Sequence, residues 1–296
     1  MSRLRQRQYF AQAVFIDQVW SPELNRAIQF DIVVAALFDD KSALVDQHAN
    51  TINLPSRHNL TANAKAAGTP LTPQAITETQ QQFVLPMTNG HRAIAQMIED
   101  IAEIQSRYDI RSETTIAGAY ALARQMDVDA AGLFGAATNS VGTTGAELTD
   151  DNLIQARTLL RNQAAPRPWY IVVPPATYSG FLKLEKFTNM LYVGEAENGT
   201  AVEEARVGKI YGADVYESQL LAGSAPNATG AFWSKTHYFK AIQRQPTTHT
   251  WYSPLDLSWV VSMDCVYGMF ERLEADEAAA ATTNSSDWSV KALCVK

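Results

Sequence analysis

The hydrophobic pattern is strongest between residues 112 and 134, where it predicts the longest helix of the chain. Apolar side chains recur on one side of this segment at helical spacing, at Ile116, Ala119, Ala123, Met126, Ala130 and Leu133. Ser112 can cap the helix N-terminus, and Gly132 and Gly135 are stop signals at the other end. At about 1.5 Å per residue such a helix runs ~33 Å, the width of a small domain. We call it the spine helix.

A long polar insertion with strand patterns at both ends precedes the spine helix. Ile52 and Leu54 alternate with polar residues, and Phe83 and Leu85 do the same on the return. The chain between them is polar, interrupted by Gly and Pro, and has few side chains to bury. Most loops in compact domains are far shorter. The pattern therefore predicts a two-stranded arm that needs a partner to hold it, with disorder as the alternative.

The second half of the chain mixes helices and strands without an internal repeat. Thr149, followed by Asp150 and Asp151, predicts the start of a helix with Leu153, Ala156 and Leu160 on its inner face. The further predicted elements are a buried strand at 169–173, a strand–turn–strand unit at 206–218, a small-residue loop at 219–231, long strands within 232–252 and 255–273, and a Ser/Asn-rich tail. This succession is typical of an α+β fold rather than of regular βαβ units.

Composition narrows the class of protein. The chain has 296 residues, 46% of them hydrophobic, which is enough for a substantial core in one or two domains. Its formal net charge of -7 argues against a molecule built wholly to bind nucleic acid. The N-terminus differs, because Arg3, Arg5 and Arg7 form a small basic arm that could contact DNA or an acidic scaffold, or simply solubilise the chain. No apolar run approaches the ~18 residues of a membrane span.

Residues arranged for catalysis or metal binding are not evident in the sequence. The five histidines form no HExxH or His-x-His pattern, and the two cysteines have neither ligand spacing nor an activating neighbour. Gly142-Thr143-Thr144-Gly145 lacks the lysine of a phosphate loop, and no GxSxG elbow occurs. The acidic clusters are typical of solvated faces. We therefore expect no catalytic residue, no metal and no cofactor.

The order of these parts resembles the major capsid protein of tailed double-stranded DNA phages, the Hong Kong 97-type fold. The segments that carry the resemblance are VWSPEL (19–24), NTINLPSR (50–57), AYALARQMDVDAAGLF (119–134), WYIVVPP (169–175), GKIYGADVYES (208–218) and VYGMFERLEADEAAA (266–280). This family is united by architecture more than by short signatures. The resemblance covers nearly the whole chain.

The resemblance implies a division of the chain into an N-terminal arm, an extended loop, a peripheral domain in two segments around an axial domain, and a tail. The corresponding ranges are 1–43, 44–88, 89–135 with 236–283, 136–235 and 284–296. In this family the extended loop lies across the neighbouring subunit, so Arg57, His58 and Lys65 are implied as inter-subunit contacts. Some relatives join a loop lysine to an asparagine by an isopeptide bond. Lys65 and Asn284 could form such a pair, but an ordinary solvated lysine is the stronger reading.

The function implied is a shell protein that self-assembles into hexamers and pentamers around the phage genome in the virion capsid, formed in the host bacterial cytoplasm. Its implied partners are further copies of itself, a scaffolding protein, a portal, a decoration protein and double-stranded DNA, without a membrane. Two alternatives stay open. One is an encapsulin, a nanocompartment shell of the same fold that encloses an enzyme. The other is a small hydrolase whose catalytic residues are not grouped in the sequence.

Overall fold

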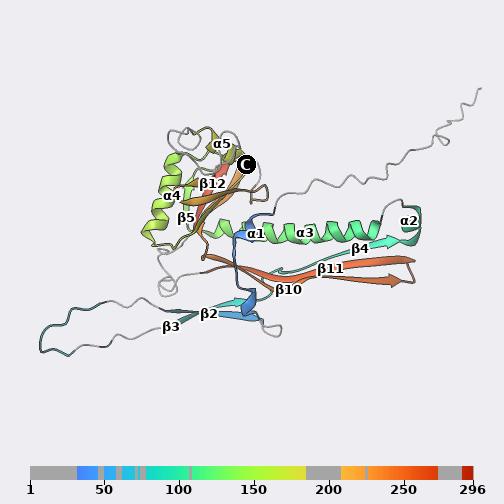
Figure 1. The fold of residues 1–296 in the computed structure, drawn as a ribbon, viewed down its shortest axis with the longest axis horizontal. Coiled ribbons are helices and arrows are strands. Elements are labelled where there is room, and N and C mark those ends of the chain that lie inside the picture. Colours follow the sequence, from blue (N-terminus) through green and yellow to red (C-terminus); the bar gives the residue numbers. More distant parts are fainter. Residues whose placement is uncertain are drawn as a thin grey trace, which may run out of the picture.

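The computed structural model describes residues 32–45, 50–57, 62–70, 73, 78–106, 109–184, 208–223, 226–272 and 289–295 (Figure 1). The helical elements are α1 (Val34–Leu37), η2 (Ser42–Leu44), α2 (Asp100–Gln105), α3 (Ile110–Gly132), η3 (Leu133–Ala136), α4 (Asp150–Asn162) and α5 (Pro175–Leu182). The strands are β1 (Asp39–Asp40), β2 (Thr51–Arg57), β3 (Glu78–Val84), β4 (His91–Glu99), β5 (Asn139–Gly142), β6 (Trp169–Val173), β7 (Lys209–Ile210), β8 (Ala213–Glu217), β9 (Asn227–Ser234), β10 (Tyr238–Ser253), β11 (Ser258–Glu271) and β12 (Ser289–Val295). Among the described helices, none is long and apolar enough to cross a membrane.

Three sheets organise the residues that the structure describes, and the α+β prediction is confirmed. The strand orders are β1-β10-β11-β4, β5-β12-β9-β6-β8-β7, and the separate hairpin β2-β3. Figure 1 shows the six-stranded sheet with α4 and α5 at one end of the molecule. The long four-stranded sheet runs beside α3 toward the opposite end, and the β2–β3 hairpin projects on its own.

The spine helix is α3, but its start and its buried face differ from the prediction. It begins at Ile110, and the Asp109 side chain rather than Ser112 caps it, accepting hydrogen bonds from the amides of Arg111 (3.1 Å) and Ser112 (3.2 Å). Its buried residues are Thr114, Gly118, Leu122, Asp127, Ala130 and Ala131. Ile116 is 41% exposed and Ala119 is also exposed, so the predicted apolar stripe is wrong over the first half of the helix.

Close packing explains why a glycine and a leucine define the buried face of α3. A Cβ atom added at Gly118 would lie 1.9 Å from Cε of Met263 on β11, so the helix approaches the sheet at the position with the smallest residue. Leu122, one turn later, is 2% exposed and belongs to the same core. The helix ends at Gly132 and continues as η3, which agrees with the predicted stop.

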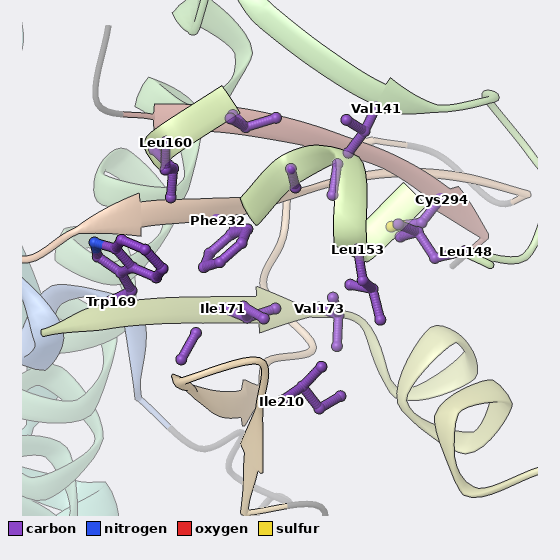
Figure 2. Packing of buried hydrophobic residues seen from close by; sticks show 14 of the residues in the cluster. Val141, Leu148, Leu153, Leu160, Trp169, Ile171, Val173, Ile210, Phe232 and Cys294 are labelled. Atoms are coloured by element: carbon purple, nitrogen blue, oxygen red, sulfur yellow. The ribbon is translucent and has the colours of Figure 1, made fainter. Parts of the chain in front are cut away.

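The six-stranded sheet and its helices enclose one hydrophobic core, and local signals anticipated most of it. Thr149 caps α4 by accepting from the Asn152 amide at 3.4 Å, and α4 buries the three residues predicted for its inner face, Leu153, Ala156 and Leu160. Figure 2 shows Trp169, Ile171 and Val173 of β6 in this core, with Phe232 of β9 close to Trp169. The Trp169 and Phe232 rings meet edge to face, 6.0 Å between centroids.

Two predicted irregular segments are instead strands of this sheet. Residues 227–231 of the expected loop begin β9, because their small side chains allow close packing: a Cβ at Gly230 would lie 2.5 Å from the carbonyl oxygen of Val172. The expected tail contains β12, which lies between β5 and β9. Alternate residues of β12, Val290, Ala292 and Cys294, are all buried. The end of the chain is therefore a central strand of the core.

An aromatic cluster joins the two large sheets. Phe38 from the segment after α1 stacks on Tyr238 at the start of β10, 5.2 Å between ring centroids. Phe134 of η3 packs on Trp233 of β9 at 5.1 Å. Trp233 belongs to the six-stranded sheet and Tyr238 to the four-stranded sheet, so the rings at the ends of α1 and of the spine helix fix the two sheets relative to each other.

A buried carboxylate holds the short helix α1 against the spine helix. Asp127 is 0% exposed, and its Oδ1 accepts a hydrogen bond from the amide of Ala35 at 2.7 Å. On the other side, Lys240 Nζ donates to the carbonyl of Ala35 at 3.0 Å. Burial raises the pKa of Asp127, while the backbone amides of Ala35, Val33 and Val34 oppose that rise.

Replacing Asp127 by alanine should lower the free energy of unfolding by about 1–3 kcal/mol, because buried amides of α1 lose their acceptor. Asp127→Asn keeps an oxygen acceptor and removes the charge, so at neutral pH it should change stability far less. Since burial raises the folded-state pKa of Asp127, its protonated form is the one that favours folding; this contribution is complete below the unfolded pKa and is lost as pH rises through the folded pKa. Denaturant unfolding of both variants at several pH values measures their free energies of unfolding. Equal losses of stability for Asp127→Ala and Asp127→Asn would contradict the role of the side-chain oxygen as an acceptor.

Candidate assembly interface

The β2–β3 hairpin is rooted in the subunit by a small apolar cluster. Its strands pair from Thr51 opposite Val84 to Arg57 opposite Glu78. Ile52 (4% exposed) and Leu85 (2%) are buried at the root, as the alternation predicted. Phe83 packs against two rings of the four-stranded sheet, Phe239 at 4.9 Å and Phe270 at 5.2 Å between centroids. The root is therefore part of the subunit core.

Beyond its root the hairpin has no partner within the described subunit. Every residue from 62 to 70 is exposed, and Figure 1 shows the hairpin projecting away from both large sheets. Lys65 lies in this exposed stretch and Arg57 ends β2 opposite Glu78, whereas His58 lies outside the described residues. An ordered root that carries an exposed extension is suited to contact a second molecule.

A second exposed surface lies at the far end of the four-stranded sheet. We call it the tip patch; its residues and exposed fractions are Met97 (55%), Ile101 (66%), Ile104 (82%), Trp251 (49%), Leu255 (96%) and Leu257 (64%). Figure 1 shows that α2 and the β10–β11 turn, which supply most of these residues, lie at the same end of the molecule. Isolated exposed apolar residues are normal, but a group of this size is typical of an interaction surface.

Polar contacts hold the tip in place while its apolar side chains face solvent. The amide of Asp100 donates to the carbonyl of Leu257 at 3.1 Å, which attaches α2 to the β10–β11 turn. Tyr252 donates its hydroxyl to Asp100 Oδ2 at 2.9 Å, and this hydrogen bond raises the pKa of Tyr252. The Arg111 guanidinium lies 4.2 Å from the centroid of the Trp259 ring. The exposed apolar surface thus belongs to a defined conformation.

The face of the four-stranded sheet carries a compact charged cluster around Asp264. This carboxylate accepts from Thr247 Oγ1 at 2.9 Å and lies 3.1 Å from Arg244 Nη1 and 3.4 Å from His91 Nε2. The Thr247 hydrogen bond, with smaller contributions from His91 and Arg244, lowers the pKa of Asp264. Asp264 therefore stays ionised and links three strands.

The remaining expected site residues are not brought together. Arg3, Arg5, Arg7 and Asn284 lie outside the described residues, so contacts with DNA or a scaffold and the Lys65–Asn284 pair remain predictions. Within the part of the chain that the structure describes, no group of His, Cys, Asp and Glu could hold a metal ion. Cys265 and Cys294 are buried, and burial raises the pKa of each thiol.

Sequence reasoning missed the tip patch. Its residues fall in two segments about 150 positions apart, and neither segment has a helical or strand alternation that marks an exposed apolar face. The one local signal was Leu255 and Leu257 beside Pro254 in a turn, where apolar residues are out of place.

Comparison with known proteins identifies the family. The family model described as phage capsid protein matches residues 92–283, about two thirds of the chain. A search of curated proteins finds no match. A structure from Mycobacterium phage Che8 is similar with a TM-score of 0.75 and 20% identity, covering 94% of this chain and 97% of that one. The mature capsid of bacteriophage PhiM1 has a TM-score of 0.69 at 15% identity, covering 99% and 96%.

A third similar structure is the capsid of the native GTA particle, with a TM-score of 0.66, 12% identity and coverage of 97% and 98%. At these identities the structures establish the shared fold, which confirms the Hong Kong 97-type expectation. The family match favours a virion shell over the encapsulin and hydrolase alternatives. The chain belongs to the phage capsid protein family and is a major capsid protein of the tailed-phage type, located in the virion capsid.

Proposed function

We propose that this protein builds its shell through two cooperating contacts, the β2–β3 hairpin and the tip patch. The observation that carries the proposal is the contrast between a rooted, ordered subunit and two outlying surfaces that nothing in the described subunit covers. Hexamers and pentamers arise when each hairpin lies across a neighbouring subunit. Residues Arg57, His58 and Lys65 are the proposed polar contacts of the hairpin.

The proposed domain roles follow the two sheets. The six-stranded sheet with α4 and α5 forms the axial domain around the capsomer axis, and β12 extends this domain to include residues 289–295. The four-stranded sheet with α3 forms the peripheral domain. Each contact is modest, but a subunit that engages neighbours through two separated surfaces gains avidity of ~100-fold or more over either contact alone.

The remaining partners belong to the same proposal. The shell encloses double-stranded DNA and contacts it without sequence specificity, and the net charge of -7 favours a surface that does not grip a polyanion during packaging. Arg3, Arg5 and Arg7 are the proposed contacts with DNA or with an acidic scaffolding protein. A portal and a decoration protein complete the particle, which is assembled in the bacterial cytoplasm.

Charging the tip patch tests the proposal. Ile104→Glu combined with Leu255→Glu should leave the thermal unfolding of the subunit unchanged within about 0.5 kcal/mol, because both side chains are already exposed. Burying two carboxylates at an apolar contact costs several kcal/mol, so electron micrographs should show closed shells for the wild-type protein and none for this variant.

The matched control adds the same two charges far from the tip, at Thr158→Glu on α4 and Ser179→Glu on α5, both of which are exposed. These substitutions should leave assembly nearly intact. Shells of normal yield from the tip variant would show that the patch is not an assembly contact. A wild-type protein that stays monomeric at high concentration, with and without a scaffold, would refute the proposed function itself.

A further inference from the structure

Strand β10 has an outer edge that is covered only at its beginning. β1 pairs with it at Phe239 and Lys240, and the amide of Ile242 donates to Ser42 Oγ at 3.0 Å. On its inner edge β10 pairs with β11 as far as Ser253 opposite Ser258. No other described strand pairs with the outer edge. Past Ile242, therefore, the described structure gives this edge no strand to pair with.

The first part of this edge is protected against pairing, and the last part is not. Register shifts occur between Ile242 and Thr247, and Pro246 in that stretch has no amide hydrogen to donate. The residues that follow, Thr247–Ser253, pair with β11 in unbroken register. We call them the edge segment. Its sequence, TTHTWYS, contains Thr, Trp and Tyr, and it has no Pro, Gly, Lys or acidic residue.

The edge segment is also sterically accessible. Residues 248–252 are all exposed, including Trp251 at 49% and Tyr252 at 38%. Helix α3 packs mainly on β11 and β4, and Figure 1 shows β10 on the side of the sheet away from this helix. A regular, β-prone and uncovered edge is a template for a strand of another molecule.

We propose that two copies of this chain pair antiparallel through their edge segments, centred on Thr250, and so join two four-stranded sheets across a twofold axis. The proposal rests on the shell-forming function above and names one of its contacts. A second copy fits because the segment is complementary to itself. In this register His249 of each copy faces Trp251 of the other, and Thr248 faces Tyr252, so no like charges stand opposite each other.

The flanks of the edge segment favour the same arrangement. Antiparallel pairing about Thr250 brings the end of one copy that carries the Arg244–Asp264 ion pair toward the turn of the other copy that carries Asp256, so a basic side chain and an acidic one approach each other on both sides of the axis. Centring the pair on His249 would instead place two imidazoles opposite each other.

Cysteine cross-linking within assembled particles tests the proposal. Opposite residues on paired strands have Cβ atoms ~5 Å apart, so Thr250→Cys places two thiols within reach of a short bis-maleimide. Thr248→Cys is a matched control on the same face of the strand, but its two copies lie four residues apart, ~14 Å. The native Cys265 and Cys294 are 1% and 0% exposed, so they should react little with the cross-linker. The wild-type protein measures this background reaction.

We expect at least about tenfold more covalent dimer from Thr250→Cys than from Thr248→Cys or from the wild-type protein, on denaturing gels. Equal yields from both variants, or no dimer in particles that are intact in electron micrographs, would overturn the pairing and leave the proposed function standing. The absence of dimer in intact particles is also the result expected if the edge segment binds β4 of another copy or a different protein. Dimer specific to Thr250→Cys without any shells would support the pairing and contradict the proposed function.

Discussion

Removing the body of the β2–β3 hairpin should abolish shell assembly while leaving the subunit folded. Arg57 and Glu78 are opposite each other in the ladder, so residues 58–77 can be replaced by Asn-Gly, a two-residue turn that preserves the register. The root cluster around Ile52 and Leu85 is untouched. Every subunit loses the proposed hairpin contact with its neighbour, so the fraction of protein in assembled shells should fall about 100-fold.

Circular dichroism, thermal unfolding and electron microscopy separate the two effects. The stability of the subunit should change by less than about 1 kcal/mol, because each doubling of loop length is worth only about 0.6 kcal/mol and the deleted residues that the structure describes are exposed. An unfolded deletion variant would place these residues in the subunit core. Normal shells would show that the hairpin is not an assembly contact.

Substituting Leu122 by glutamate should unfold the subunit. Leu122 lies on the buried face of the spine helix, is 2% exposed, and belongs to the core that joins the two sheets. The substitution removes buried apolar surface and places a carboxylate in an apolar site, at a cost of about 4 kcal/mol or more. Far-ultraviolet circular dichroism and urea titration of the soluble fraction measure the loss.

The matched control is Ile116→Glu on the same helix. Ile116 is 41% exposed, so its replacement should change the free energy of unfolding by about 0.5 kcal/mol. The pair distinguishes the observed orientation of α3 from the one that periodicity predicted. If Ile116→Glu were the more damaging variant, the helix would present its other face to the sheet.

Local chemistry determined a large part of the fold, and the sequence alone was enough to find it. The Thr149 cap with Asp150 and Asp151 marks the start of α4, and Pro174 marks the end of the buried strand β6. Alternation places Ile52 and Leu85 inside the hairpin root. Each of these signals depends on residues close together in the chain, where propensity, capping and alternation act. The order of the segments, taken together, was then sufficient to indicate the capsid family.

Contacts between distant residues decided the rest. The buried face of α3 depends on how closely the helix approaches Met263, so Gly118 is inside because it is small, a property that hydrophobic periodicity does not measure. The last strand, β12, is central because it pairs with β5 and β9, and its seven residues carry too short a pattern to reveal that. Asp127 reaches Ala35 across 92 positions.

One part of the candidate interface was predictable from the sequence, and the rest was decided by the tertiary structure. The hairpin was predictable because a polar insertion with patterned ends cannot bury itself. The tip patch and the uncovered edge of β10 were not, because exposure is defined only after every other element has taken its place. Leu255, in the turn between β10 and β11, is 96% exposed and Tyr238, at the start of β10, is fully buried, although both are large side chains in segments predicted as strands. Only the tertiary structure separates surfaces that complete the subunit from surfaces left for its neighbours.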